Sequence, residues 1–236
     1  MHFPTFFFGS GKIVHMNWLN LIGTACAFGL FSLKEGGRVR RRYYANNRFK
    51  SADKALKRRY LWQNPYAICR RFLAAKGYRD VHSYGETPLT SLEQIARICS
   101  LTKEDVFLDL GCGRGRGVFF LHHLFGCPAI GIDWVPRFIE KAKEVAEATR
   151  SPVEFICGNM VHCNAELSRA TVIYLAWTCL EEEDRSRIEE ALRNSRPGTR
   201  IVTVSYPFTS KDFTAKEASV ISFPWGEAEV FFHERK

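Results

Sequence analysis

The sequence predicts an α/β fold in which a mostly parallel sheet is covered by helices and ends in a C-terminal antiparallel hairpin. From residue 106 onward, short apolar or β-branched runs alternate with segments of helical periodicity, a pattern typical of parallel strands joined by crossover helices. Near the C-terminus, two strand-like runs within residues 217–236 are separated only by PWGE, so they are expected to pair as a hairpin. A chain of 236 residues can bury one good core, and we expect one domain with appendages.

The expected elements follow one another in the order of this alternation. Strands are predicted at VFLDL, AIGID, VEFIC, TVIYLA and RIVTVSY, which are residues 106–110, 129–133, 153–157, 171–176 and 200–206. Helices are predicted between them at 117–125, 135–149 and 181–195. Pro136 falls in the first turn of the second helix, where a missing N–H group costs nothing, and the acidic residues 181–184 lie at the start of the third.

The first 33 residues form a hydrophobic segment before this domain. Residues 13–33 contain no Lys, Arg, Asp or Glu and are about long enough for a helix to cross a bilayer, so they predict a hydrophobic helix that anchors the chain in a membrane. A secretory signal carries positive charge before its apolar run, whereas here only Lys12 precedes the run and KEGGRVRRR follows it. The positive-inside tendency then places the rest of the chain in the cytosol. The alternative is a soluble cytoplasmic chain with an amphipathic leader.

Residues 34–80 form a basic, partly helical segment ahead of the α/β domain, which is expected to span 81–236. Between Lys34 and Arg59 the sequence holds eleven Lys and Arg residues but only two acids, Glu35 and Asp53, which accounts for the whole formal charge of +9. Such a segment favours an anionic partner, either a phospholipid surface or nucleic acid. For nucleic acid, the aromatic side chains available for base stacking would be Tyr43, Tyr44, Tyr60 and Trp62.

The cysteines indicate neither a disulfide framework nor a metal site. The eight cysteines contain no Cys-x-x-Cys pair and mostly lie in apolar surroundings, so we expect reduced core residues. Two sets that could surround a metal lack any zinc-ligand spacing: His122, His123 and Cys127, and Cys157, His162 and Cys163. No metal is therefore predicted.

The stretch VFLDLGCGRGRG places glycines at Gly111, Gly113 and Gly115 directly after the first predicted strand. A glycine-rich turn at this point lets a ligand approach the backbone at the carboxyl end of the sheet. Dinucleotide sites use Gly-x-Gly-x-x-Gly, and the third glycine of that motif would fall on Arg116, so an oxidoreductase is disfavoured. Asp109 would repel a phosphate but suits a ligand with a free amino group, such as S-adenosylmethionine.

LDLGCGRG resembles the first motif of the class I, or seven-strand, S-adenosylmethionine-dependent methyltransferases. The resemblance implies a Rossmann-like seven-strand methyltransferase sheet with S-adenosyl-L-methionine as cofactor, held at Asp109 and at the three glycines of the turn. It also implies that Asp133, at the end of AIGIDW, accepts the ribose hydroxyls, and that Asn159 and Met160, in FICGNMVHC, lie against the adenine. Taken singly, these residues could instead be turn glycines, a helix-capping aspartate and a loop asparagine.

The upstream sequence SYGETPLTSLEQIARICSLTKEDVFLDLGCGRG resembles one subgroup, the non-SET protein-lysine methyltransferases of the disruptor-of-telomeric-silencing type. The likeness runs from about Tyr84 to His233. It implies a lid over the cofactor formed by YGET, with Tyr84, Glu86 and Thr87 as cofactor-binding residues. It also implies a narrow lysine channel lined by Trp225 and Phe231, where an aromatic wall would desolvate the lysine stem and favour its neutral amine.

Two departures from that subgroup concern the residues around the target lysine. The subgroup has a pair of asparagines after the fourth strand, where this chain has Ala176 and Trp177 followed by Thr178. Its closing tyrosine is replaced by Phe231 or Phe232, which lack the hydroxyl group. The resemblance therefore does not carry over a histone as substrate. A related group of seven-strand protein-lysine methyltransferases pairs a hydrophobic N-terminal segment with a similar domain and methylates lysines of membrane proteins. The layout of this group resembles that of the present chain more closely, although its motifs match less well.

The sequence thus predicts an S-adenosylmethionine-dependent methyltransferase that transfers methyl to a protein lysine, with Thr178, Trp225 and Phe231 near the reacting groups. The expected chemistry is an in-line attack by a neutral amine, which requires alignment and a dry channel and for which we assign no general base. One alternative is an RNA or DNA methyltransferase that uses the basic segment, although YLAWTC lacks the Asn/Asp-Pro-Pro-aromatic motif of many such enzymes. Another is a non-catalytic, membrane-associated protein that only binds the cofactor.

Overall fold

The computed structural model describes residues 18–78 and 84–236 and, within the first helix, side chains from residue 29 onward. Before the sheet come four helices: α1 (Trp18–Arg42), α2 (Asn47–Arg59), α3 (Pro65–Ala75) and α4 (Leu89–Ile98). The alternating part holds β1 (Phe107–Leu110), α5 (Arg116–Phe125), β2 (Ala129–Asp133), α6 (Pro136–Thr149), β3 (Glu154–Cys157), a 3₁₀ turn η1 (Met160–His162), α7 (Asn164–Leu167), β4 (Val172–Leu175), α8 (Glu182–Leu192) and β5 (Arg200–Val204). The chain ends in β6 (Phe213–Phe223) and β7 (Gly226–Arg235).

The strands form one seven-stranded sheet in the order β3-β2-β1-β4-β5-β7-β6. The first five strands in the chain pair in parallel, whereas β7 is antiparallel to both β5 and β6. This confirms the predicted α/β class with a mostly parallel sheet and a terminal hairpin. The hairpin is longer than predicted, because β6 begins at Phe213 and crosses a bulge between Ala215 and Glu217.

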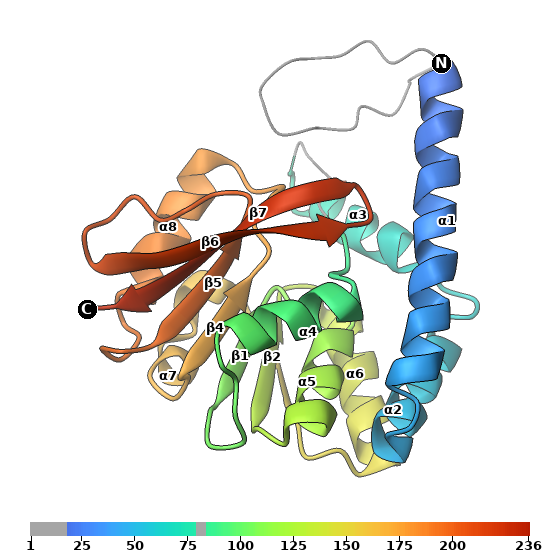
Figure 1. The fold of residues 1–236 in the computed structure, drawn as a ribbon, viewed down its shortest axis with the longest axis horizontal. Coiled ribbons are helices and arrows are strands. Elements are labelled where there is room, and N and C mark those ends of the chain that lie inside the picture. The colour runs from blue at the N-terminus through green and yellow to red at the C-terminus, as the bar shows by residue number, and fades with distance from the viewer. Residues whose placement is uncertain (1–17, 79–83) are drawn as a thin grey trace.

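Helices cover both faces of the sheet (Figure 1). One apolar layer packs side chains of α1–α6 against one face, and a second packs α8 and the segment around α7 against the other. The middle strands are buried on both sides: all four residues of β1 and of β4 are buried, as expected for parallel strands between two helical layers. Both layers therefore fix the ends of β1 and β4, where the candidate site lies.

The helix α1 joins the hydrophobic and basic segments in one continuous element. Its apolar residues from Trp18 to Leu33 lead directly into the basic run that ends at Arg42, and its second half packs against α4. Glu35 fixes this packing, because its carboxylate accepts hydrogen bonds from the backbone N–H and the hydroxyl of Thr90. None of the helices in residues 18–78 and 84–236 has the length and apolarity needed to cross a bilayer, so the anchor predicted over 13–33 gains no support, and residues 13–17 of it lie outside the described part.

Candidate active site

The glycine-rich turn joins β1 to α5 at the carboxyl edge of the sheet. β1 has β2 on one side and β4 on the other, so the strand order reverses here, which is the position where open α/β sheets bind ligands. All three glycines of the turn have positive φ, and a Cβ on Gly115 would lie 2.3 Å from Cε1 of Phe155. A Cβ on Gly111 would meet only the methyl of Met160, at 3.6 Å. Gly115 is therefore required for packing, whereas Gly111 leaves the backbone open to a ligand.

Asp109, on β1, is a buried carboxylate without a hydrogen-bond donor. Asp109 is only 7% exposed, and no hydrogen-bond donor to its carboxylate is found within residues 18–78 and 84–236. Burial, and after it the charge of Asp133, raises the pKa of Asp109 to about 7. A mostly buried carboxylate without a bonded donor is unfavourable in an empty protein and becomes favourable beside a cation. The position thus fits a ligand that brings a positive charge.

Asp133, at the end of β2, holds the glycine-rich turn in place. One carboxylate oxygen accepts the backbone N–H of Gly113 at 2.8 Å and the other accepts the backbone N–H of Val135 at 2.8 Å. Burial raises the pKa of Asp133 to about 6, although these two backbone hydrogen bonds act in the opposite direction. Each carboxylate oxygen has two lone pairs, so both can accept a further hydroxyl group.

The segment containing YGET lies directly over the turn. A Cβ on Gly113 would come within 3.0 Å of the ring of Tyr84, whose hydroxyl donates to Glu86 at 2.5 Å. Arg114, in the turn itself, makes a two-point ion pair with Glu86, with an Nη2–Oε2 distance of 2.7 Å. Burial alone would raise the pKa of Glu86, but Arg114, together with Arg116 and the hydroxyl of Tyr84, outweighs burial and the pKa is lowered. The ionised carboxylate of Glu86 thus links the YGET segment to the glycine-rich turn.

Other predicted residues surround the same edge. Thr87 and the buried Tyr174 of β4 share a hydrogen bond between their hydroxyls at 2.7 Å. Asn159 caps the 3₁₀ turn after β3 by accepting the N–H of Val161 at 3.1 Å, and this brings Met160 against Gly111. The structure therefore places the predicted cofactor-binding residues around the ends of β1, β2 and β3, with Thr87 against β4.

The residues after β4 divide between the site and the core. Thr178 shares a 2.9 Å hydrogen bond with Ser205, which follows β5 and has a φ of +76°. Strain of this kind in a non-glycine residue is concentrated at functional sites. Trp177 is instead buried, and its ring N–H donates to the carbonyl oxygen of Tyr206 at 2.9 Å. Trp177 is therefore a packing residue of the second apolar layer.

The structure does not bring Trp225 and Phe231 to the same face of the hairpin. Trp225, in the β6–β7 turn, is 38% exposed and stacks on Phe223, which belongs to the layer that contains α4. Phe231 lies opposite Thr203 on β5 and stacks with His233. Phe231 and His233 face away from the layer that contains α4. Val230 and Phe232, the alternate residues of β7, face into that layer. Because side chains alternate along a strand, a single channel lined by Trp225 and Phe231 is not formed here.

Trp225 approaches the YGET segment rather than Phe231. A Cβ on Gly85 would lie 3.7 Å from Cζ3 of the Trp225 ring. The exposed part of this ring therefore lies beside the segment that covers the glycine-rich turn. Trp225 is the member of the predicted catalytic set that the fold places next to the predicted lid.

Sequence reasoning missed one part of the site, the support that α2 gives to the turn. Arg116, the first residue of α5, pairs with Asp53 of α2 at 2.7 Å, and the Asp53 side chain is fully buried. Tyr44 and Lys57 complete the group, each donating to Asp53 at 2.7 Å. The only signal in the sequence was the acid itself, one of two in a long basic run.

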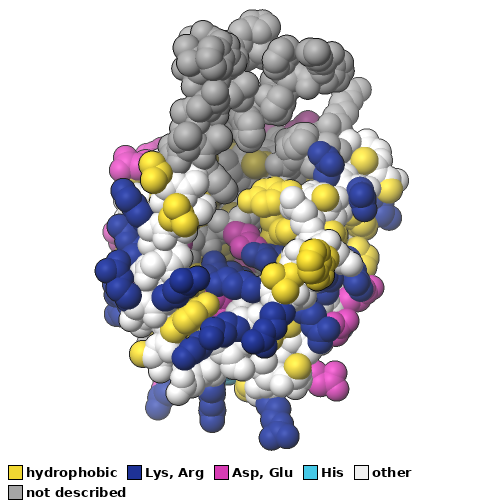
Figure 2. All heavy atoms as spheres, turned by 90° about the vertical axis from the view of Figure 1, so that its right-hand side faces the viewer, with side chains coloured by type: hydrophobic (Ala, Val, Ile, Leu, Met, Phe, Trp, Pro, Cys, Tyr) yellow, Lys and Arg dark blue, Asp and Glu magenta, His cyan; other side chains and the backbone are white. Residues whose placement is uncertain are grey.

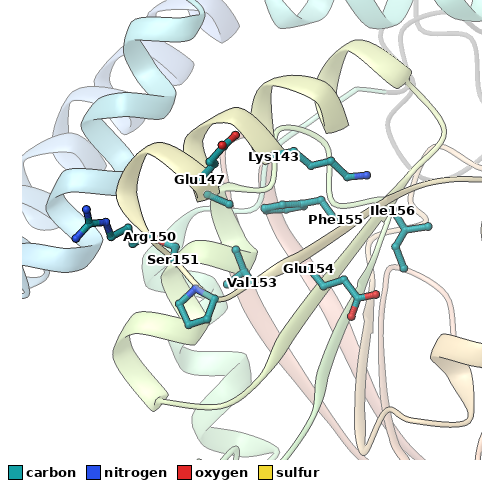
Figure 3. Close-up of a pocket in the computed structure, with 10 residues that line it drawn as sticks. Lys143, Glu147, Arg150, Ser151, Val153, Glu154, Phe155 and Ile156 are labelled. Carbon is teal, nitrogen blue, oxygen red and sulfur yellow. The ribbon is translucent and has the colours of Figure 1, made fainter.

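An open hollow elsewhere on the surface is unrelated to this edge. It measures about 710 Å³ and lies between the end of α6 and the start of β3, with Lys143, Glu147 and Glu154 among its lining residues (Figure 3). The glycine-rich turn and Asp133 lie at the opposite ends of these two elements. The hollow carries no part of the site.

Comparison with known proteins identifies the fold around this edge. Residues 107–198 match the family described as "Methyltransferase domain". In a structure search, an RNA methyltransferase from Salinibacter ruber, solved in complex with S-adenosyl-L-homocysteine, superposes with a TM-score of 0.54 at 22% identity. The match covers 64% of this chain and 94% of that one.

Three curated relatives are similar at low identity. The histone H3 lysine-79 N-methyltransferase of Dictyostelium discoideum is 24% identical over 62% of this chain, which spans only 9% of that protein. The carboxy-S-adenosyl-L-methionine synthase of Psychromonas ingrahamii is 26% identical over 57% of each chain. A protein-lysine N-methyltransferase of Saccharolobus islandicus is 27% identical over 57% of this chain and 81% of the relative. The names of these relatives specify different substrates and products.

Proposed function

From the premise that residues 107–198 form a class I methyltransferase domain whose cofactor is S-adenosylmethionine, we propose that the chain transfers a methyl group to a lysine side chain of a protein. The single observation that carries the substrate class is the position of Trp225 beside the YGET segment. Two of the three curated relatives are protein-lysine methyltransferases, which supports the same class.

The residues at the sheet edge fit the cofactor. The carboxylate of Asp109 lacks a donor, and the α-amino group of S-adenosylmethionine supplies both a donor and the missing positive charge. Asp133 keeps free lone pairs for the two ribose hydroxyls, while Asn159 and Met160 lie where an adenine would reach the end of β3. Tyr84, Glu86 and Thr87 then close the pocket from above.

The chain's own residues would act mainly by alignment and exclusion of water. When bound, the cofactor supplies an electrophilic methyl group on a sulfonium ion. A target lysine would have to release its proton to solvent before its nitrogen lone pair could displace the sulfur from the methyl carbon. The apolar face of Trp225 would desolvate the approaching amine and lower its pKa. Thr178, whose hydroxyl shares a hydrogen bond with Ser205, would orient the amine beyond the end of β4.

The test is transfer of labelled methyl from S-adenosylmethionine into a cell extract by the full-length chain, with separate aliquots treated with protease and with nuclease. Label that is lost on protease treatment and found on lysine by mass spectrometry supports the proposal. Label that is lost on nuclease treatment would replace it with a nucleic-acid methyltransferase, the reaction named for the Salinibacter ruber neighbour. An absence of label with the cofactor still bound would favour the non-catalytic alternative.

Trp225→Ala separates a substrate role from a structural one. Because Trp225 touches the lid but no residue that would hold the cofactor's charged groups, we expect turnover to fall about 10-fold or more, with the S-adenosylmethionine Kd changed less than about 2-fold. Val220→Ala is a matched control, since Val220 lies on β6 and is 59% exposed. An equal loss of turnover and cofactor affinity in Trp225→Ala would show that the ring only supports the fold.

A further inference from the structure

Residues 34–76 of the basic segment expose positive charge without any exposed carboxylate. The two acids in this range both face inward: Glu35 is 8% exposed and binds Thr90, and Asp53 is 1% exposed and binds Arg116. Ion pairs bind only part of the basic set, namely Arg42, Lys57 and Arg59. The outward charge of residues 34–76 is therefore entirely positive.

The helix α2 displays this charge on its outward surface. Its buried residues Phe49, Ala52, Asp53 and Leu56 form an inward stripe that packs against α5 and α6. Lys54 and Arg58, one turn apart, lie on the opposite face and Arg48 lies on its flank; all three are exposed and make no ion pair with any residue of the described chain. Figure 2 shows that Lys and Arg side chains dominate the middle and lower part of this side of the molecule, with hydrophobic side chains among them.

The exposed aromatic residues next to the outward surface of α2 are not those expected from the sequence. Tyr43, Tyr44 and Tyr60 are tied into the interior: the first two donate hydrogen bonds to Glu93 and Asp53, and Tyr60 lies beneath the cations of Arg114 and Lys141. The side chain that is free to stack is Trp62, in the turn between α2 and α3, which is 95% exposed. Tyr66, in the first turn of α3, is 49% exposed.

The surface formed by α2, Trp62 and Tyr66 is fixed to the α/β domain by side-chain contacts and extends to the candidate site. Lys141 of α6 donates to the carbonyl oxygen of Arg59, and Asp53 holds α2 against the first residue of α5. The ring of Tyr66 lies edge-on to that of Tyr84, with centroids 5.1 Å apart. A molecule bound along α2 and across Trp62 and Tyr66 would therefore reach the rim of the lid.

We propose that the outward face of α2, together with Trp62 and Tyr66, is a binding surface for single-stranded nucleic acid. Unpaired Lys and Arg side chains on one helix surface can bind a phosphate backbone, and exposed aromatic rings next to them can stack on bases. An anionic membrane is the other polyanion of suitable charge. A helix that lies in a membrane interface inserts a free apolar face, whereas the apolar stripe of α2 is already buried against α5 and α6.

The test is the binding of fluorescein-labelled oligo(U) and oligo(dT) of about 15 nucleotides to the full-length chain, followed by fluorescence anisotropy. No S-adenosylmethionine or substrate is added, so the result does not depend on the proposed activity. Lys54→Glu combined with Arg58→Glu should weaken binding at least about 10-fold and make the slope of log K against log salt less steep. Trp62→Ala should weaken it between about 5-fold and 100-fold.

A charge-matched control is available on the other side of the molecule. Arg196 and Lys211 are exposed, make no ion pair within the described residues and lie in loops around α8 and β6, so Arg196→Glu combined with Lys211→Glu changes the net charge equally. Equal weakening in both double variants would overturn the proposal in favour of bulk charge. Two other results would also overturn it: unchanged binding in Trp62→Ala, or binding to phosphatidylserine vesicles but to neither oligonucleotide. Circular dichroism of each variant verifies that the fold is kept.

Discussion

Replacing Asp109 with asparagine should stabilise the cofactor-free protein and abolish cofactor binding. Burial, and secondly the charge of Asp133, raises the pKa of Asp109 from 3.8 to about 7. Each unit of pKa difference corresponds to about 1.4 kcal/mol, so holding this carboxyl ionised at pH 8 costs the folded state up to about 4 kcal/mol. Asparagine has nearly the same shape and no charge. We therefore expect Asp109→Asn to raise the free energy of unfolding by about 2–4 kcal/mol at pH 8.

The sign of the pH dependence gives a second check on Asp109. A carboxyl whose pKa is higher in the folded state favours folding while both states are protonated, and this contribution is lost as the pH rises through the folded-state value. The gain in Asp109→Asn should thus be near zero at pH 4 and should grow as the pH rises to about 7. Urea denaturation at a series of pH values measures this gain, and calorimetry with S-adenosylmethionine measures the loss of binding.

Asp133→Asn provides the matched control for this experiment. Asp133 also has a raised pKa, of about 6, but both of its oxygens accept backbone N–H groups. An amide has only one acceptor oxygen and would leave one N–H group facing another donor, so this variant should be less stable than the parent. The reasoning about Asp109 is refuted if Asp109→Asn lowers the stability at pH 8, or if it binds the cofactor with unchanged affinity.

Two further predictions concern the supports of the glycine-rich turn. Asp53→Asn should lower the free energy of unfolding by about 3–5 kcal/mol, because it leaves the guanidinium of Arg116 buried without its partner. The same change should weaken cofactor affinity. Chemical denaturation measures the first effect and calorimetry measures the second. Gly115→Ala should lower the free energy of unfolding by at least about 2 kcal/mol, because φ is +77° there and the new methyl would lie 2.3 Å from Phe155. Gly158→Ala is the control: a methyl there has no neighbour within 4 Å, so stability should change by less than about 0.5 kcal/mol. A Gly115→Ala protein as stable as Gly158→Ala would show that the turn adjusts freely.

The sheet was predictable because its signals are local. Buried parallel strands read as short apolar runs, and the helices between them begin with recognisable residues such as Pro136. The start of β6 was missed because Lys216 and Glu217 give a polar, bulged stretch, which does not show the alternation of a half-buried strand. Local pattern thus fixes where the strands of the parallel part lie, but not how far an irregular edge strand extends.

The sequence does not show which side chains lie on which face of the hairpin. In VFFH every residue from Val230 to His233 is partly or fully buried, so composition does not show which side chains face α4. The pairing of Phe231 with Thr203 decides this, and that pairing depends on how β7 adds to β5. An aromatic channel inferred by counting residues along the chain therefore requires the register of the sheet, which becomes known only from the fold.

The connection between the basic segment and the cofactor edge also depends on long-range contacts. Arg114 and Arg116 stand on either side of Gly115 and point to different partners, one to Glu86 in the lid and the other to Asp53 on α2. The glycine spacing of the motif specifies neither arginine, and their partners lie 28 and 63 positions away in the sequence. Because one short turn carries both contacts, a shift of α2 acts on the same backbone that would hold the cofactor. A ligand bound to the outward face of α2 that moved this helix would therefore change cofactor affinity through Asp53, without touching the cofactor itself.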